Sequence, residues 1–114
     1  MELKVRKSGS VYIIDIEGEM DLYNAFKLKE LVGKMLEKRI TLFVLNMEKV
    51  EYIDSSGIGA LIYVSSALKK RSARLIITNV HGSVKKVIEL TKLTGYFPMR
   101  DTLKEGILEL QRGQ

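Results

Sequence analysis

Two short, nearly continuous apolar runs, TLFVLNM at 41–47 and RLIIT at 74–78, constrain the fold of this chain most strongly. Such runs are typical of strands that are buried on both faces, as in parallel sheets. Apolar residues at helical spacing precede, separate and follow them, at 22–39, 56–71 and 83–92. Because helices usually connect parallel strands, the alternation predicts an α/β sandwich with right-handed crossovers.

The start of the chain has the pattern of a β-hairpin. Residues 2–6 alternate between polar and apolar, and residues 11–17 form a second strand-like segment. Between them, Ser8 and Gly9 are a turn signal. We therefore expect two antiparallel strands before the first helix.

A break is expected after the second strand, at 18–21 (GEMD), where a glycine is combined with acids. Either Asp21 or Asn24 can serve as N-cap of the first helix. Functional groups of open parallel sheets gather at the carboxyl ends of the strands. Segments 18–21, 46–56 and 79–83 are therefore expected to meet at that end.

The last third of the chain contains weaker signals. Gly95 can end the helix at 83–92, and residues 96–99 can form a short edge strand, where Pro98 is tolerated. Thr102 and Glu105 have the spacing of a capping box. The helix that they begin is expected to turn three residues inward: Leu103, Ile107 and Leu110.

Length and composition limit the classes that the protein can belong to. The 114 residues fit one domain over 1–114, with a mixed, mostly parallel sheet of four to five strands and about four helices. There is no cysteine, signal peptide pattern or apolar run of membrane-spanning length, and we expect a cytoplasmic protein. The net charge of +5 is spread without a basic, aromatic-containing stripe, so we expect no direct nucleic-acid binding.

The segment DSSGIG at 54–59 lies at a predicted junction between a strand and a helix. It lacks the Gly-x-Ser-x-Gly of a hydrolase nucleophile elbow, and the only histidine, His81, is better explained as a cap or a surface residue than as a base. A Walker A loop is absent as well. No acidic or histidine cluster has metal-ligand spacing, and Glu19, Asp21 and Asp54 could converge on a cation only if the fold brought them together, so we expect no metal. Without an elbow, a base or a Walker A loop, we also expect no cofactor and no catalytic residues.

Helix capping explains part of this segment. Asp54, Ser55 and Ser56 each offer a side-chain oxygen that can accept from the free N–H groups of a helix start. Capping does not explain Gly57 and Gly59, because a glycine inside a helix costs up to about 1 kcal/mol relative to alanine. Glycines there allow a close approach, by a neighbouring strand or by an outside partner. For Gly59, packing of the helix against the sheet is an equal alternative.

A hydroxyl at a helix N-terminus has one further property. A phosphate placed there faces free N–H donors and the positive end of the helix dipole. Phosphorylation is therefore expected to leave the domain folded while adding about −1.5 to −2 charges to its surface. A partner that docks on that surface would be ejected, which makes a switch without an internal conformational change.

The segment MEKVEYIDSSGIGALI at 47–62 resembles the phosphorylation site of bacterial anti-sigma factor antagonists, members of the STAS domain family. GEMD at 18–21 is similar to the family's Gly-Glu-Leu-Asp before the first helix. LFVLNMEKV at 42–50 resembles its central strand, with Asn46 near the strand's end. The resemblance extends over essentially the whole chain and implies a stand-alone, STAS-like domain.

The resemblance also implies a function. In such systems the unphosphorylated antagonist binds an anti-sigma factor that is also an ATP-dependent serine kinase, and the sigma factor is released. The kinase phosphorylates the first serine of the motif, here Ser55, and a PP2C-type phosphatase reverses this. Ser56 is the weaker acceptor and the better candidate for a helix cap. The resemblance places partner contacts, or the shaping of the docking surface, at six positions: Asp21, Asp54, Ser56, Gly57, Ile58 and Gly59.

Other readings of the same residues stay open. Some STAS domains belong to stress-signalling assemblies or to membrane transport systems, and this chain could be such a subunit. A small enzyme or nucleotide-binding protein that uses the same loop is a third reading, for which no general base is evident. The family's antagonists are often acidic, and the charge of +5 leaves partner recognition open.

Overall fold

The chain begins with the expected hairpin, in which strand β1 (Glu2–Ser8) pairs antiparallel with β2 (Val11–Met20). Strands β3 (Leu42–Ile53), β4 (Arg74–Thr78) and β5 (Met99–Arg100) are added in parallel, each beside the strand before it. The resulting five-stranded sheet has the order β1-β2-β3-β4-β5. The structure is a computed structural model that describes residues 1–113.

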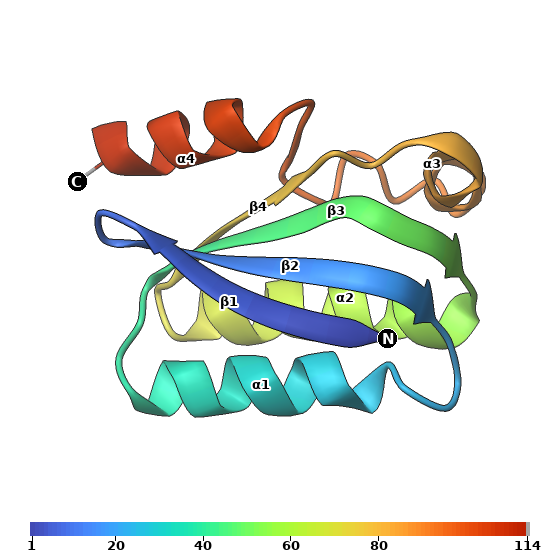
Figure 1. The fold of residues 1–114 in the computed structure, drawn as a ribbon, viewed down its shortest axis with the longest axis horizontal. Helices are drawn as coiled ribbons and strands as arrows, with labels where there is room; N and C mark the ends of the chain where they lie inside the picture. The colour runs from blue at the N-terminus through green and yellow to red at the C-terminus, as the bar shows by residue number, and fades with distance from the viewer. Residues whose placement is uncertain (114) are drawn as a thin grey trace.

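Four helices cover this sheet: α1 (Phe26–Glu37), α2 (Ser55–Lys70), α3 (Gly82–Leu90) and α4 (Leu103–Arg112). Figure 1 shows α1 and α2 side by side on one face of the sheet, and α4 on the opposite face. Helix α3 packs against β3. The mixed, mostly parallel sheet with its opening hairpin confirms the predicted α/β sandwich.

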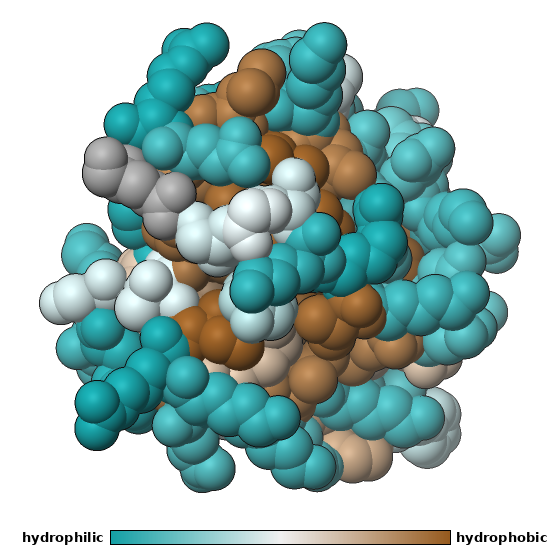
Figure 2. Space-filling model, turned by 60° about the vertical axis from the view of Figure 1, so that its left-hand side comes forward, coloured by the Kyte–Doolittle hydropathy of each residue, from teal (hydrophilic) through white to brown (hydrophobic). Residues whose placement is uncertain are grey.

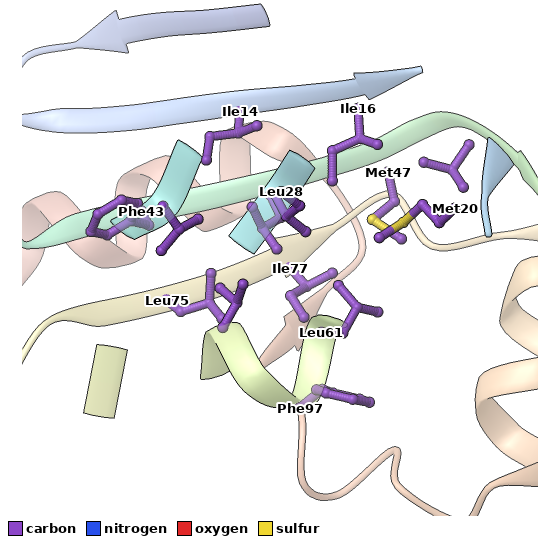
Figure 3. Close-up of a cluster of buried hydrophobic side chains, with 14 of the residues drawn as sticks. Ile14, Ile16, Met20, Leu28, Phe43, Met47, Leu61, Leu75, Ile77 and Phe97 are labelled. Atoms are coloured by element: carbon purple, nitrogen blue, oxygen red, sulfur yellow. The ribbon is translucent and has the colours of Figure 1, made fainter. Parts of the chain in front are cut away.

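The sheet separates two hydrophobic clusters of unequal size. The larger lies between the sheet and helices α1, α2 and α3, and Figure 3 shows part of it, including Ile14, Phe43, Leu61 and Ile77. The smaller lies under α4 and contains six buried residues: Val11, Ile13, Leu42, Val44, Ile76 and Leu110. On the face shown in Figure 2, hydrophilic side chains cover much of the surface, with hydrophobic ones visible between them.

Two strands are longer than the sequence predicted. Strand β2 continues through the expected break at 18–21 as far as Met20, and β3 continues to Ile53, where the two residues pair. Gly18 lies in the left-handed region, with a φ of 95°, beside one of two register shifts in this ladder. The prediction of a break was wrong because these irregularities let β2 follow the extension of β3.

The first helix begins later than predicted, at Phe26. Neither Asp21 nor Asn24 caps it, so both cap predictions were wrong. The Asn24 side-chain oxygen accepts from the Asp21 N–H at 3.0 Å, and the Asp21 carboxylate accepts from the Tyr23 N–H at 2.9 Å. These side chains close a turn instead, because short polar side chains compete with the helix for nearby N–H groups. The N-cap position is Ala25, which has no side-chain cap bond.

The C-terminal third also departs from prediction in detail. Helix α3 ends at Leu90, and Lys92, not Gly95, takes the left-handed conformation after it, with a φ of 61°. The edge strand β5 begins only at Met99, three residues later than predicted, and extends to Arg100, because a turn closed by a Tyr96 N–H to Leu93 carbonyl bond precedes it. Thr102 does cap α4, accepting from the Glu105 N–H at 3.2 Å, as the capping box predicted.

The predicted inward face of α4 is confirmed. Leu110 is fully buried, and Leu103 and Ile107 pack, partly buried, against the smaller cluster. Among residues 1–113, no helix is both long and apolar enough to cross a membrane.

Candidate functional site

The N-terminus of α2 is capped by Asp54. One oxygen of its carboxylate accepts from the Ser56 N–H at 2.8 Å and from the Gly57 N–H at 3.2 Å. Asp54 has an extended backbone, with a φ of −114°, as an N-cap requires. The preference for Ser56 as the cap was therefore wrong, because the helix begins one residue earlier, at Ser55, and Ser56 lies within its first turn.

Ser55 is the first residue of α2 and is exposed to solvent. Its hydroxyl forms no hydrogen bond with any residue from 1 to 113. Since the Asp54 carboxylate already accepts from the N–H groups of Ser56 and Gly57, the Ser55 hydroxyl is not needed as a cap of the helix. It is therefore free to react with a partner or to contact one.

The two glycines of the segment have opposite surroundings. A Cβ at Gly57 would lie 2.5 Å from the Met20 carbonyl oxygen and 2.6 Å from an Ile53 side-chain carbon. Gly57 therefore allows a close approach by the fold itself, at the end of β2. A Cβ at Gly59 would have no atom within 4 Å, and Gly59 is exposed. The reading of Gly59 as a helix–sheet packing residue was wrong.

Ile58, between the glycines, is only 7% exposed and belongs to the larger core cluster. Ile58 and Gly57 thus hold the start of α2 from inside. The surface of the site is left to Ser55, Gly59 and the partly buried Asp54 and Ser56.

The three segments expected at the carboxyl ends of the strands do meet. Met20 pairs with Ile53, and the Asp54 N–H donates to the Met20 carbonyl at 3.2 Å. On the other side of β3, a ring nitrogen of His81 lies 2.7 Å from the Glu48 carbonyl oxygen, and the Ser83 hydroxyl donates to Glu51 at 3.5 Å. The extension of β3 is therefore held between the loop after β2 and the start of α3.

Asp21 follows Met20 directly and is partly buried, with its carboxylate on the Tyr23 N–H. Beside it lies an apolar patch that the sequence interpretation missed: Leu22, Tyr23 and Phe26, of which Tyr23 is 82% exposed. Phe26 could have indicated this patch, because it falls outside the apolar stripe that Leu28 and its helical neighbours form. Leu22 was assigned to a helix that does not yet exist at that residue.

A polar cluster joins β1, β2 and β3 just before the β3 extension. Arg6 donates two hydrogen bonds to Asp15, at 2.5 and 2.9 Å, and the Asn46 amide donates to the same carboxylate at 2.8 Å. Burial alone would raise the pKa of Asp15, but the hydrogen bonds from Arg6 and Asn46, with the charge of Arg6, outweigh it. The pKa of Asp15 is therefore lowered from its ordinary value of 3.8.

Next to it, a hydrogen bond from Lys49 and the charge of Lys4 lower the pKa of Glu17. These contacts link neighbouring strands and stabilise the sheet. Within residues 1–113, no three His, Cys, Asp or Glu side chains are grouped so that they could hold a metal ion.

Comparison with known sequences identifies relatives of this chain. The family model of the STAS domain matches residues 2–106. An anti-sigma-B factor antagonist from Staphylococcus aureus is 26% identical, with 82% of this chain and 86% of that protein covered. The anti-sigma-B factor antagonist of Listeria monocytogenes is 25% identical, with 89% and 88% covered.

Solved structures show the same fold at lower identity. A Thermotoga maritima protein superposes with a TM-score of 0.89 at 23% identity, covering 96% of this chain and 95% of that one. The anti-sigma factor antagonist SpoIIAA gives TM-scores of 0.74 unphosphorylated and 0.73 phosphorylated, both at 20% identity, with 99% of this chain and 100% of that one covered. A sulfate transporter family protein from Wolinella succinogenes gives 0.80 at 20% identity, with 92% and 88% covered.

The family match extends over nearly the whole chain, and the solved structures above share its fold. The chain belongs to the STAS domain family.

Proposed function

We propose that this protein is an anti-sigma factor antagonist whose binding to its partner is switched off by phosphorylation of Ser55. The observation that carries the proposal is the exposed, unbonded hydroxyl of Ser55 at the start of a helix that Asp54 already caps. Its relatives in Staphylococcus aureus and Listeria monocytogenes are named anti-sigma-B factor antagonists. Their similarity spans most of both chains.

In the proposed cycle, the unphosphorylated protein binds an anti-sigma factor that is also a serine kinase, and the sigma factor is released. The kinase transfers a phosphoryl group from ATP to the Ser55 hydroxyl, and the complex separates. A PP2C-type phosphatase removes the phosphate by hydrolysis and restores binding. The chemistry belongs to these partners, and this cytoplasmic protein is their substrate and ligand.

The geometry around Ser55 favours a mechanism in which the charge of the phosphate separates the complex, without a change in the shape of this protein. Because Asp54 occupies the N–H groups of Ser56 and Gly57, a phosphate on Ser55 finds fewer free donors than a bare helix start offers. It would also lie beside the Asp54 carboxylate, so it would point outward. SpoIIAA supports this, since its two forms match the present fold almost equally, with TM-scores of 0.74 and 0.73.

Contacts with the kinase are proposed for the exposed side of this site. Asp21, Asp54, Ser56 and Gly59 lie where a docked protein can reach them, whereas Gly57 and Ile58 shape the surface from beneath. The Leu22–Tyr23–Phe26 patch adds the large apolar area that hot spots of protein interfaces require. Asp21 lies next to this patch, at the start of the same loop.

One experiment tests the acceptor directly. The purified protein is incubated with ATP and the anti-sigma factor kinase encoded in the same genome, and the modified residue is located by mass spectrometry. We expect one phosphate, on Ser55, in the wild type and in Ser56→Ala, and none in Ser55→Ala. A phosphate on another residue, or none on the wild type, contradicts the proposal.

A second candidate is a STAS subunit of a stress-signalling or membrane transport complex. The fold match to a sulfate transporter family protein favours it. Affinity purification from the native cells distinguishes the two, since the second candidate predicts recovery of a transporter or a large assembly in place of a small kinase.

A further inference from the structure

A groove of about 710 Å³ runs between α1 and α2 on the outer side of the larger core cluster. We call it the α1–α2 groove, and its walls include Lys29, Gly33 and Glu37 from α1 and Gly59, Tyr63 and Ala67 from α2. The two helices lie side by side along its length (Figure 1). Val32 and Leu36 of its lining belong to the larger core cluster, whereas Gly33, Gly59 and Tyr63 are exposed.

The lining residues repeat at helical spacing on both walls. On α2, residues 59, 62, 63, 66, 67 and 70 follow one stripe, and on α1 residues 29, 32, 33, 36 and 37 follow another. The stripe on α2 contains Ile62, Tyr63 and Ala67, of which Tyr63 is exposed. Two such stripes side by side form the kind of surface on which a third helix packs, at an interaxial distance of about 8–10 Å.

Two helical glycines keep the groove open. Gly33 and Gly59 are both exposed, and a Cβ at either would have no atom within 4 Å. Neither has a positive φ, so the backbone does not require glycine at these positions. A glycine inside a helix is unfavourable unless something approaches its backbone closely. No residue within 1–113 makes that approach, which leaves an outside partner.

The charges around the groove specify what that partner is. Three cations line it, Lys29, Lys70 and Arg71, against one carboxylate, Glu37. In the described chain, residues 1–113, no salt bridge involves any of these three cations. The ammonium of Lys29 lies 5.2 Å from the centre of the Tyr63 ring, over an apolar wall. Complementary charge on the ligand would be negative.

We propose that the α1–α2 groove binds an acidic amphipathic α-helix of a partner protein. Ile62, Tyr63 and Ala67 of the α2 stripe receive the apolar face of that helix, and its backbone can approach closely at Gly33 and Gly59. The cations lie toward both ends of the groove, Lys29 on the first turn of α1 and Lys70 and Arg71 at the end of α2, which suits a helix with acids along its length. A second copy is a poorer occupant, because a symmetric contact would bring its own basic rim against this one.

Two model helices test the proposal on the full-length protein. Both are hydrocarbon-stapled 16-residue peptides with the same leucine stripe, one flanked by glutamates and the other by lysines. We expect the glutamate helix to shift the amide NMR signals of Gly33, Gly59 and Tyr63, and the lysine helix to bind at least tenfold more weakly. Equal affinity, no shifts, or shifts centred on another face overturn the proposal.

Variants separate the groove from the fold. Gly33→Gln and Gly59→Gln fill open space with a better helix former, so the melting temperature should hold or rise while affinity for the glutamate helix falls at least tenfold. Lys29→Glu with Lys70→Glu should reverse the preference between the two helices. The matched control, Lys104→Glu on α4, should leave it unchanged. Retained binding in both glycine variants overturns the proposal.

Two other occupants have their own signatures. If dodecanoate shifts the same groove signals and binds with higher affinity than the glutamate helix, the groove is a site for anionic amphiphiles and the helix assignment is overturned. A wild-type dimer in sedimentation that becomes monomeric in Gly59→Gln would assign the groove to a second copy and overturn it as well.

Discussion

The Met20 carbonyl at the end of β2 accepts a hydrogen bond from the Asp54 N–H at 3.2 Å. The same carbonyl oxygen would lie only 2.5 Å from a Cβ atom placed on Gly57. One carbonyl thus fixes the start of α2 against the end of β2. It also explains why the residue two positions after Ser55 is a glycine.

Gly57→Ala should destabilise the protein by about 1–3 kcal/mol, because the added methyl group overpacks a site walled by backbone. The matched control is Gly59→Ala, which meets open space and should gain up to about 1 kcal/mol from its better helix propensity. Urea denaturation measures both. Equal effects at the two positions would contradict the assignment of Gly57 to the fold.

Asp54→Ala should cost about 1 kcal/mol of unfolding free energy, because the Ser56 and Gly57 N–H groups lose their acceptor. Asp54→Asn keeps a side-chain acceptor and should retain most of that stability. Ser56→Ala should be nearly neutral, since the Ser56 hydroxyl does not cap α2. A larger loss in Ser56→Ala than in Asp54→Ala would assign the cap to the serine after all.

Stability should depend on pH through Asp15. Because the folded pKa of Asp15 is lowered, the carboxylate stabilises the native state above its ordinary value of 3.8. That contribution should decline as the pH falls from this value through the lower, folded pKa. Urea midpoints from pH 7 to pH 2 should therefore fall more steeply for the wild type than for Asp15→Asn. Parallel curves for the two proteins would rule out the effect.

The exposed patch beside Asp21 should contribute to binding of the kinase and not to the stability of the fold. Tyr23→Ala and Phe26→Ala should each weaken binding of the kinase at least tenfold, because large apolar side chains dominate interface energetics. Leu90→Ala is the matched control, since Leu90 on α3 is 81% exposed and far along the chain. Calorimetric titration measures all three, and equal affinity for Tyr23→Ala and Leu90→Ala would remove the patch from the interface.

The sequence allowed the architecture to be predicted because its signals are local. The apolar run at 41–47 became the first half of β3 and the run at 74–78 the whole of β4, and the helices lie close to where periodicity placed them. The length of β3 could not be predicted in this way, because its extension places buried Val50 and Ile53 among exposed charged residues. That extension is built by pairing with β2, which is a tertiary contact.

Within the site, sequence placed Ser55 at a helix start but could not choose between neighbours of similar type. Asp54 and Ser56 are both good caps, and only the end of β3 decides which of them precedes the helix. Gly57 and Gly59 look alike in sequence and have opposite surroundings, because Met20 lies against one of them alone. Such differences depend on distant segments.

Binding of the kinase to the protein before and after phosphorylation of Ser55 tests the central claim most directly. Calorimetric titration should show tight binding for the unphosphorylated protein and binding at least a hundredfold weaker for the phosphorylated one. Melting temperatures of the two forms should be nearly equal, since the phosphate lies on an exposed residue whose hydroxyl the fold does not use. Equal affinity of the two forms for the kinase would contradict the account.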